Sequence, residues 1–153
     1  MNILGVTSAV IFSLSPILEV RAGIPFAVKL GLGIWSAFLI CLIANIALIP
    51  IVFFFLDYAH DHLMKISLYS RMFNSYLGRV RRKSEEKISG NWPYVALFGF
   101  VGLPFPGTGV WTAVLVSWFF KMNRRKSFVS IMLGSLCVSL LVTLITLGVI
   151  SVI

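Results

Sequence analysis

Two long runs without a charged residue dominate the hydropathy pattern of the chain. They cover residues 33–56 and 127–153, and each exceeds the ~20 residues that an α-helix needs to cross ~30 Å of hydrocarbon. Two further apolar segments, 3–30 and 92–120, are interrupted by prolines, glycines and, in the first segment, charged residues. The pattern predicts an all-α integral membrane protein with two full transmembrane helices and two interrupted segments.

The breaks in the interrupted segments have the composition of turns. Stretch 16–25 reads PILEVRAGIP and contains Glu19 and Arg21, whereas stretch 104–109 reads PFPGTG. Proline removes a backbone donor and clashes with the preceding helical turn, and glycine weakens a helix. Irregular backbone at membrane depth persists only where protein or a wet cavity satisfies its polar groups. Each interrupted segment is therefore predicted to form two short helical arms.

The distribution of basic residues decides between a crossing and a return for segment 92–120. Both loops that flank it are basic, and the positive-inside rule places both in the cytoplasm. The loop before the segment contains Lys65, Arg71, Arg79, Arg81, Arg82, Lys83 and Lys87, and the loop after it contains Lys121, Arg124, Arg125 and Lys126. Segment 92–120 is therefore predicted to be a re-entrant hairpin that enters from the cytoplasm and returns to it.

The same reasoning gives an architecture of two inverted repeats. Residues 1–57 form a re-entrant hairpin and a transmembrane helix, residues 92–153 repeat this order in the opposite orientation, and both termini lie outside the cell membrane. Residues 58–91 form a basic, amphipathic cytoplasmic linker that is attracted to anionic lipid. An alternative remains for the first segment, because charge alone also permits residues 3–18 to cross with an internal N-terminus.

A short internal sequence similarity favours a different alignment of the two repeats. Residues 33–37, which read GIWSA, resemble residues 109–113, which read GVWTA. This match would pair a transmembrane helix with a hairpin arm, whereas residues 37–46 aligned with 127–136 pair the two transmembrane helices. Short similarities are common in apolar sequence, so the basic loops carry more weight.

Composition limits the other classes of function. The chain is 59% hydrophobic and 12% charged, and a soluble domain of 153 residues needs a more polar surface. Cys41 and Cys137 lie inside apolar runs as packing residues, so no metal or other cofactor is predicted. No nucleophile stands near a base at a recognisable spacing, and the chain is predicted not to be an enzyme. Nothing indicates nucleic-acid binding.

The candidate site consists of the residues at the two breaks. Ionisable residues within a membrane segment mark a substrate or ion path by default, and helix N-termini attract anions. Glu19 is expected to act as counter-ion, as proton carrier or as acceptor for a cationic substrate, and Arg21 is expected to bind the substrate. The remaining substrate-binding candidates are Gly23, Pro25, Pro104, Pro106, Gly107, Thr108, Gly109, Trp111 and Thr112.

Two other polar features are interpreted as structural. Asn45 is the lone amide in a transmembrane segment, and an interhelical hydrogen bond is expected for it. Asp57, His60, Asp61 and His62 cluster where a helix meets water, which favours a solvated helix end over a metal site.

The two breaks resemble the paired signatures of the small multidrug export family, distantly similar to the DedA-like (VTT-domain) membrane proteins. The resemblance implies drug efflux, and its DedA-like branch implies two facing re-entrant hairpins that transport a lipid phosphate. Glu19 and Arg21 match the charged residues of the first hairpin, whereas the second break has no charged residue and departs from the DedA pattern.

The function predicted from these observations is a small transporter with a midplane site between opposed hairpins. Its substrate would be amphiphilic or lipid-like, either a lipid phosphate or a lipophilic drug, and transport would be coupled to protons through Glu19. Because a monomer with two full spans encloses little space, at least a homodimer is expected. The alternative is a membrane scaffold or assembly protein that docks through its basic linker.

Overall fold

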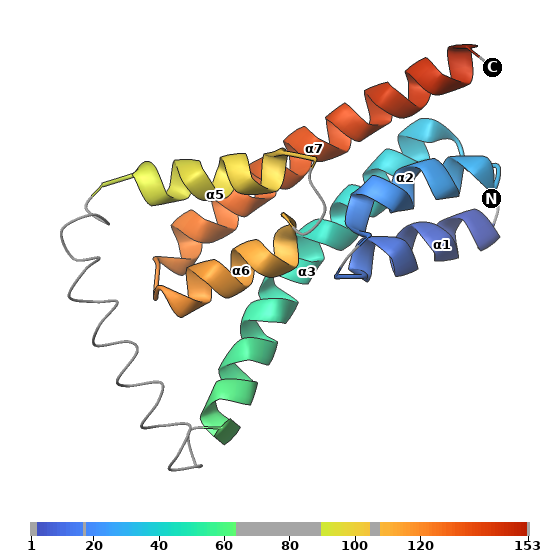
Figure 1. Ribbon diagram of the computed structural model, residues 1–153. Helices are drawn as coiled ribbons and strands as arrows, with labels where there is room; N and C mark the ends of the chain where they lie inside the picture. Colours follow the sequence, from blue (N-terminus) through green and yellow to red (C-terminus); the bar gives the residue numbers. More distant parts are fainter. Residues whose placement is uncertain (1–2, 17, 64–89, 105–107, 153) are drawn as a thin grey trace.

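The chain forms six α-helices in the residues that the computed structural model describes, which are 3–16, 18–63, 90–104 and 108–152 (Figure 1). The helices are α1 (Ile3–Leu14), α2 (Glu19–Lys29), α3 (Ile34–Leu63), α5 (Trp92–Gly102), α6 (Val110–Phe119) and α7 (Arg124–Val152). The break between α5 and α6 includes the predicted stretch 104–109. The first break is shorter than predicted: α2 already begins at Glu19, so Arg21, Gly23 and Pro25 of the predicted break at 16–25 lie inside a helix. The all-helical class is confirmed for the described residues.

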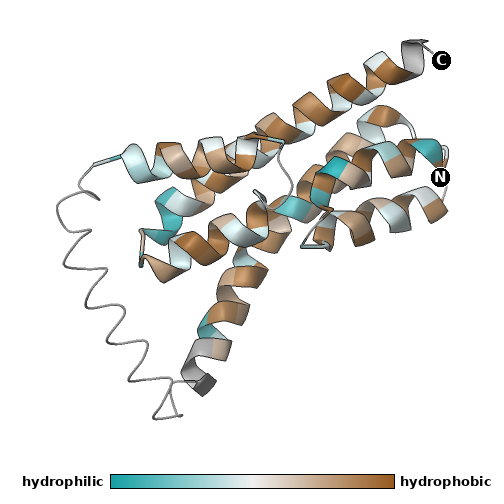
Figure 2. Ribbon diagram, viewed as in Figure 1, coloured by the Kyte–Doolittle hydropathy of each residue, from teal (hydrophilic) through white to brown (hydrophobic). Residues whose placement is uncertain are grey.

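Two of these helices are long and apolar enough to cross a membrane. The candidate spans are Ile34–Ala59 in α3 and Arg124–Val149 in α7, each of 26 residues. Hydrophobic residues cover most of the length of both helices (Figure 2). By contrast, α5 has 11 residues and α6 has 10. At 1.5 Å per residue, each of these arms is only about 16 Å long, which is about half of the hydrocarbon thickness.

In the first half of the chain, α1 and α2 pack against each other and against α3. Gly23 permits this close approach, because a Cβ built there would lie 2.9 Å from Ser13 Oγ and 3.1 Å from Cys41 Sγ. Both of those side chains are fully buried. Gly23, a predicted substrate-binding residue, thus lies at the junction of α1, α2 and α3.

In the second half, the two short helices take different partners. Helix α5 packs mainly against α7, whereas α6 packs mainly against α3 and touches α5 only lightly. Gly134 allows α5 to approach α7, since a Cβ built there would lie 2.8 Å from the carbonyl oxygen of Phe98 and 2.8 Å from Val101 Cβ.

Gly134→Ala is expected to lower the melting temperature of the protein in detergent. The added methyl group would meet a backbone oxygen, which cannot move without shifting α5, and such overpacking costs about 1–3 kcal/mol. Gly99→Ala is the matched control, because a Cβ at Gly99 meets nothing within 4 Å. Equal melting temperatures for the two variants would show that α5 does not pack on α7 in this way.

The two halves are joined through the long helices and across them. Helix α2 packs against α7, α6 packs against α3, and α3 packs against α7. At the α3–α7 contact, the side-chain nitrogen of Asn45 donates a hydrogen bond to Ser135 Oγ at 3.3 Å. The interhelical hydrogen bond predicted for Asn45 is therefore confirmed.

Polar contacts gather the ends of four helices at one end of the molecule, which we call the basic end. Arg124 at the start of α7 binds both carboxylate oxygens of Asp57 in α3 at 2.8 Å, and Trp118 in α6 donates to the same carboxylate at 2.9 Å. Near the start of α5, the Tyr94 hydroxyl accepts a hydrogen bond from the backbone amide of Asn123 at 3.2 Å. Helix α5 therefore begins where α6 ends, as the predicted hairpin requires.

The predicted linker lies mostly outside the described residues. Helix α3 continues beyond residue 58 to Leu63, so the first part of segment 58–91 belongs to α3. Residues 64–89, on which the prediction of an amphipathic helix rests, are outside the described part.

Candidate functional site

The two breaks in the apolar segments lie against each other in the structure. Trp111, in the first turn of α6, donates a hydrogen bond from Nε1 to the carbonyl oxygen of Leu14 at the end of α1, at 3.2 Å. Arg21 of α2 reaches backbone and side-chain oxygens of the second break. We call the region around Glu19, Arg21, Leu103, Thr108 and Gly109 the tip site.

Glu19 is buried at the centre of the tip site. It begins α2, and its side chain is only 3% exposed. Its backbone has φ 47°, a left-handed conformation that costs free energy in a residue other than glycine and is retained where surrounding contacts enforce it. The carboxylate lies so close to Gly109 that a Cβ at that position would overlap its carbon and both oxygens. Only glycine fits opposite Glu19.

The Glu19 carboxylate faces the N-terminus of α6. It interacts with the backbone amides of Val110 and Trp111 and with the positive charge of Arg21. The first amides of a helix have no acceptor within the helix and carry a partial positive charge, so they form an anion site. In this conformation a carboxylate of the chain itself occupies that site, while Glu19 Oε1 has no hydrogen-bond partner among the described residues.

Arg21 holds the second break in place. Its Nη2 donates to the carbonyl oxygens of Leu103, at 2.7 Å, and of Thr108, and to Thr108 Oγ1 at 3.1 Å. Thr108 Oγ1 in turn donates to the Leu103 carbonyl at 3.1 Å. These carbonyls flank the break between α5 and α6, where the backbone lacks helical partners. One guanidinium group therefore joins α2 to both sides of the second break.

Pro25 lies inside α2. It has no amide hydrogen, so it cannot donate the usual helical hydrogen bond to the carbonyl oxygen of Arg21 four residues earlier. Pro25 is partly buried, one helical turn from Arg21.

The structure brings some of the predicted site residues together and leaves others apart. Glu19, Arg21, Thr108, Gly109 and Trp111 meet at the tip site. Thr112 directly follows Trp111 in α6 and is partly buried, Pro104 is exposed beside Leu103, and Gly23 packs between helices. Pro106 and Gly107 lie outside the described residues. Substrate binding by these residues stays a prediction.

Sequence reasoning missed the backbone partners and the Asp57 contacts. The carbonyl oxygens of Leu14 and Leu103 were not identified, although both groups stand next to a predicted break where helical hydrogen bonding ends. Asp57 was interpreted as part of a solvated helix end, but it forms a bidentate ion pair with Arg124. No group of three potential metal ligands occurs in the described part of the chain.

Comparison with known proteins gives one match. The model of a family described as "Putative small multi-drug export protein" matches residues 19–141 of the chain. This range begins at Glu19 and includes both residues of the α3–α7 hydrogen bond and the whole of the second break. No curated protein and no solved structure matches the chain.

Proposed function

Because the chain belongs to the small multi-drug export family, we propose that it is a small membrane transporter that moves an amphiphilic or lipid-like substrate through the tip site. Family membership and the apolar helices indicate a membrane protein. The substrate class, the coupling to protons and the role of each residue are the parts that we add.

We propose that α1–α2 and α5–α6 are re-entrant hairpins that meet near the bilayer midplane. Each pair of short helices is followed by a helix of spanning length. Each short helix is too short to cross the membrane by itself. If the second half repeats the first, α6 corresponds to α2 and α7 corresponds to α3. The contact of α2 with α7 is then equivalent to the contact of α6 with α3. Transporters built from inverted repeats place their substrate site at such broken helices.

The observation that supports transport most directly is the buried carboxylate of Glu19. A charge within the membrane is expensive and is retained where it takes part in function. Glu19 occupies the amides at the start of α6, so an anionic group of a substrate would compete with it for the same donors. Protonation of Glu19 would weaken its hold on α6 and release the second break. Substrate and proton would thereby both act on the contact between the tips.

The test is transport by the purified protein reconstituted into vesicles, with lipid phosphates and lipophilic cations as the two substrate classes. Before transport is measured, each class is screened for its effect on the melting temperature of the protein, because a ligand stabilises the state that binds it. Glu19→Gln keeps the shape of the side chain and removes its charge. We expect it to reduce transport at least tenfold and to abolish its dependence on the proton gradient.

Lys29→Gln is the matched control, since Lys29 is exposed at the other end of the same helix. This variant should transport normally. The proposal is wrong if neither substrate class stabilises the protein, or if Glu19→Gln and Lys29→Gln transport equally well. The scaffold alternative would be supported by two results together: no variant and no substrate class shows transport, and neutralising the basic residues in 64–89 releases a bound partner protein.

We further propose a homodimer in the cell membrane, with the basic end in the cytoplasm. Large hydrophobic side chains such as Ile43 in α3 and Leu144 in α7 are exposed and must face lipid or another subunit. Cross-linking in native membranes should give a dimer, and cysteines introduced at the basic end should react with membrane-permeant reagents only. A monomer alone after cross-linking would contradict the homodimer. Labelling of these cysteines by an impermeant reagent from outside would contradict the cytoplasmic position of the basic end.

A further inference from the structure

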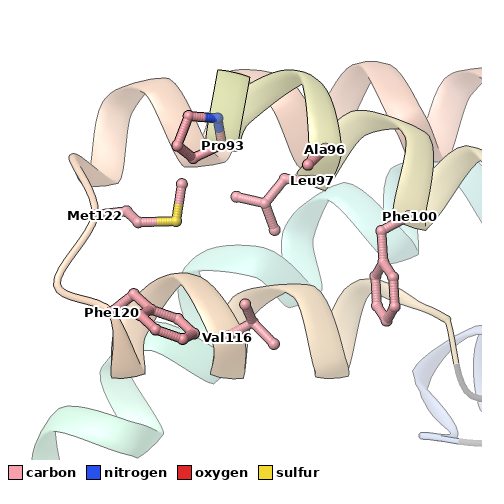
Figure 3. A pocket seen from close by; sticks show the side chains of 7 residues that line it. All are labelled: Pro93, Ala96, Leu97, Phe100, Val116, Phe120 and Met122. Atoms are coloured by element: carbon pink, nitrogen blue, oxygen red, sulfur yellow. The ribbon is translucent and has the colours of Figure 1, made fainter. Parts of the chain in front are cut away.

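An apolar cleft lies between α5 and α6, on the side of the tip site that leads to the basic end. Its volume is about 330 Å³, which falls within the range of small-molecule sites. Pro93, Ala96 and Phe100 line it from α5, Val116 and Phe120 line it from α6, and Met122 closes it from the turn after α6 (Figure 3). None of the described residues that line it is charged.

The cleft exists because α5 and α6 pack against different helices. Helix α5 packs on α7 and α6 packs on α3, so little of either arm is left to fill the space between them. In the first half, α1 and α2 pack directly on each other, and the Phe12 and Phe26 rings lie tilted with centres 4.9 Å apart.

Cations stand at the mouth of the cleft. Lys121 is exposed and lies between Phe120 and Met122 in the chain, both of which line the cleft. On the α5 side, Lys126 Nζ lies 3.3 Å from Asn91 Oδ1 and 5.4 Å from the centre of the Tyr94 ring. One lysine therefore stands in the turn that closes the cleft, and a second lies beside the start of α5, the helix that forms the other wall.

The conformation of Lys121 is a second, independent feature of the mouth. It has φ 50°, in the left-handed region that glycine usually occupies after a helix. The amides of Lys121 and Met122 close the end of α6 by donating to the carbonyls of Trp118 and Ser117, each at 3.0 Å. Glycine would serve this turn with less strain, but it would remove the cation beside the cleft.

From this combination we propose that the cleft binds an anionic phospholipid, with one acyl chain between α5 and α6 and the phosphate beside Lys121 and Lys126. An acyl chain matches the apolar lining of the cleft. A negative headgroup matches the basic mouth, as in other basic pockets at the cytoplasmic ends of membrane helices. A zwitterionic lipid would gain less from the lysines, and a lipophilic cation would be repelled by them.

The bound lipid would act as a wedge that keeps α5 and α6 apart. This site is separate from the tip site, because none of the residues that line it belongs to the tip site. The proposal therefore stands or falls independently of transport.

The experiment measures lipid binding by the full-length protein purified in detergent. Phosphatidylglycerol and phosphatidylcholine with the same acyl chains are added, and the melting temperature and the lipids retained in native mass spectrometry are recorded. We expect phosphatidylglycerol to raise the melting temperature more and to be retained preferentially. Neutralising Lys121 should weaken this binding about fivefold, as expected from about 1 kcal/mol per basic residue.

Lys121→Gly is the variant of choice, because glycine relieves the left-handed conformation and cannot fail through poor folding of the turn. It should be at least as stable as the native chain without lipid, yet respond less to phosphatidylglycerol. Ala96→Phe fills the cleft and should remove the response. Ala47→Phe, at an exposed position of α3, and Lys29→Gly, at the end of α2, are the controls for added bulk and for lost charge.

Three results would overturn the proposal. Equal stabilisation by the two lipids would show that the basic residues at the mouth do not distinguish an anionic from a zwitterionic headgroup. An unchanged response of Ala96→Phe would place the lipid elsewhere. Conversion of a dimer to a monomer by Ala96→Phe, without loss of bound lipid, would show that a second copy of the chain occupies the cleft.

Discussion

Gly109→Ala is expected to force the tips apart and to destabilise the protein by about 3 kcal/mol, the upper part of the usual range for overpacking. The reason is the position of Glu19, whose carboxyl carbon and both oxygens would overlap the new Cβ. Backbone strain does not contribute, because Gly109 has φ −125° and ψ −172°, which any residue adopts. Thermal unfolding in detergent measures the effect directly.

Gly33→Ala provides the control for this substitution. Gly33 precedes α3 as Gly109 precedes α6, in the similar local sequences GIWSA and GVWTA. A Cβ at Gly33 would meet nothing closer than Ser36 Oγ at 3.9 Å, so this variant should unfold like the native protein. A comparable loss in both variants would mean that the glycine itself, and not Glu19, sets the requirement.

A second variant tests whether Glu19 is the cause. The double substitution Glu19→Ala with Gly109→Ala removes the carboxylate that the new methyl group would meet, so it should recover most of the lost stability. Transport should stay absent, because the proposed proton carrier is missing. If the double variant is no more stable than Gly109→Ala alone, Gly109 does not face Glu19 in the protein.

The positions of the helices and their breaks follow from local features of the sequence. Pro16 and the prolines and glycines of 104–109 mark the two breaks, and the uninterrupted apolar runs match α3 and α7. Pro25 and Pro50, by contrast, lie inside helices. The hydrogen bond of Asn45 was predictable for a similar reason, because a buried amide needs a partner and the nearest candidates lie on another helix. These inferences need no knowledge of how distant segments meet.

The contents of the tip site depend on how distant segments meet. The sequence indicated that amides at the start of the second arm would bind an anion, but it did not indicate that Glu19 of the first half fills that position. This result depends on the relative placement of α2 and α6, which lie about 90 residues apart in the chain. The cleft between α5 and α6 and the ion pair of Asp57 with Arg124 are likewise products of helix packing.

Gly23 shows the opposite limit of sequence reasoning. It stands four residues after Glu19, inside the motif that suggested a substrate site, and its proximity to the charged residues made it a candidate. In the structure its missing side chain makes room for Ser13 and Cys41. A glycine near a functional residue is therefore ambiguous, because close packing of helices and close approach of a ligand both require the absence of a side chain.

Arg21→Lys is expected to open the tip site although it keeps the positive charge. Arg21 donates from Nη2 to acceptors on both sides of the second break, at residues 103 and 108. A lysine is shorter and lacks the planar guanidinium group, so we expect it to lose at least one of these contacts. Each hydrogen bond from a charged group contributes about 1.5–3 kcal/mol, and loss of one such contact corresponds to at least a tenfold change in the population of the closed tips.

The opening can be observed without a substrate. Incorporation of 5-fluorotryptophan gives fluorine resonances for the four tryptophans of the chain, among which Trp111 donates its indole hydrogen bond to Leu14 across the tips. In Arg21→Lys and Arg21→Ala the Trp111 resonance should shift or broaden, whereas the resonance of Trp92, at the start of α5, should not change. Lys29→Ala on the same helix should leave all four resonances in place.

This measurement also separates two roles for Arg21. If Arg21 binds only substrate, its removal abolishes transport but leaves the Trp111 resonance unchanged in the absence of substrate. If it holds the second break, as the hydrogen bonds to Leu103 and Thr108 indicate, the resonance changes before any substrate is added. An unchanged spectrum together with lost transport would therefore disprove the holding role. Both effects together would make Arg21 the link through which substrate binding and opening of the tips are coupled.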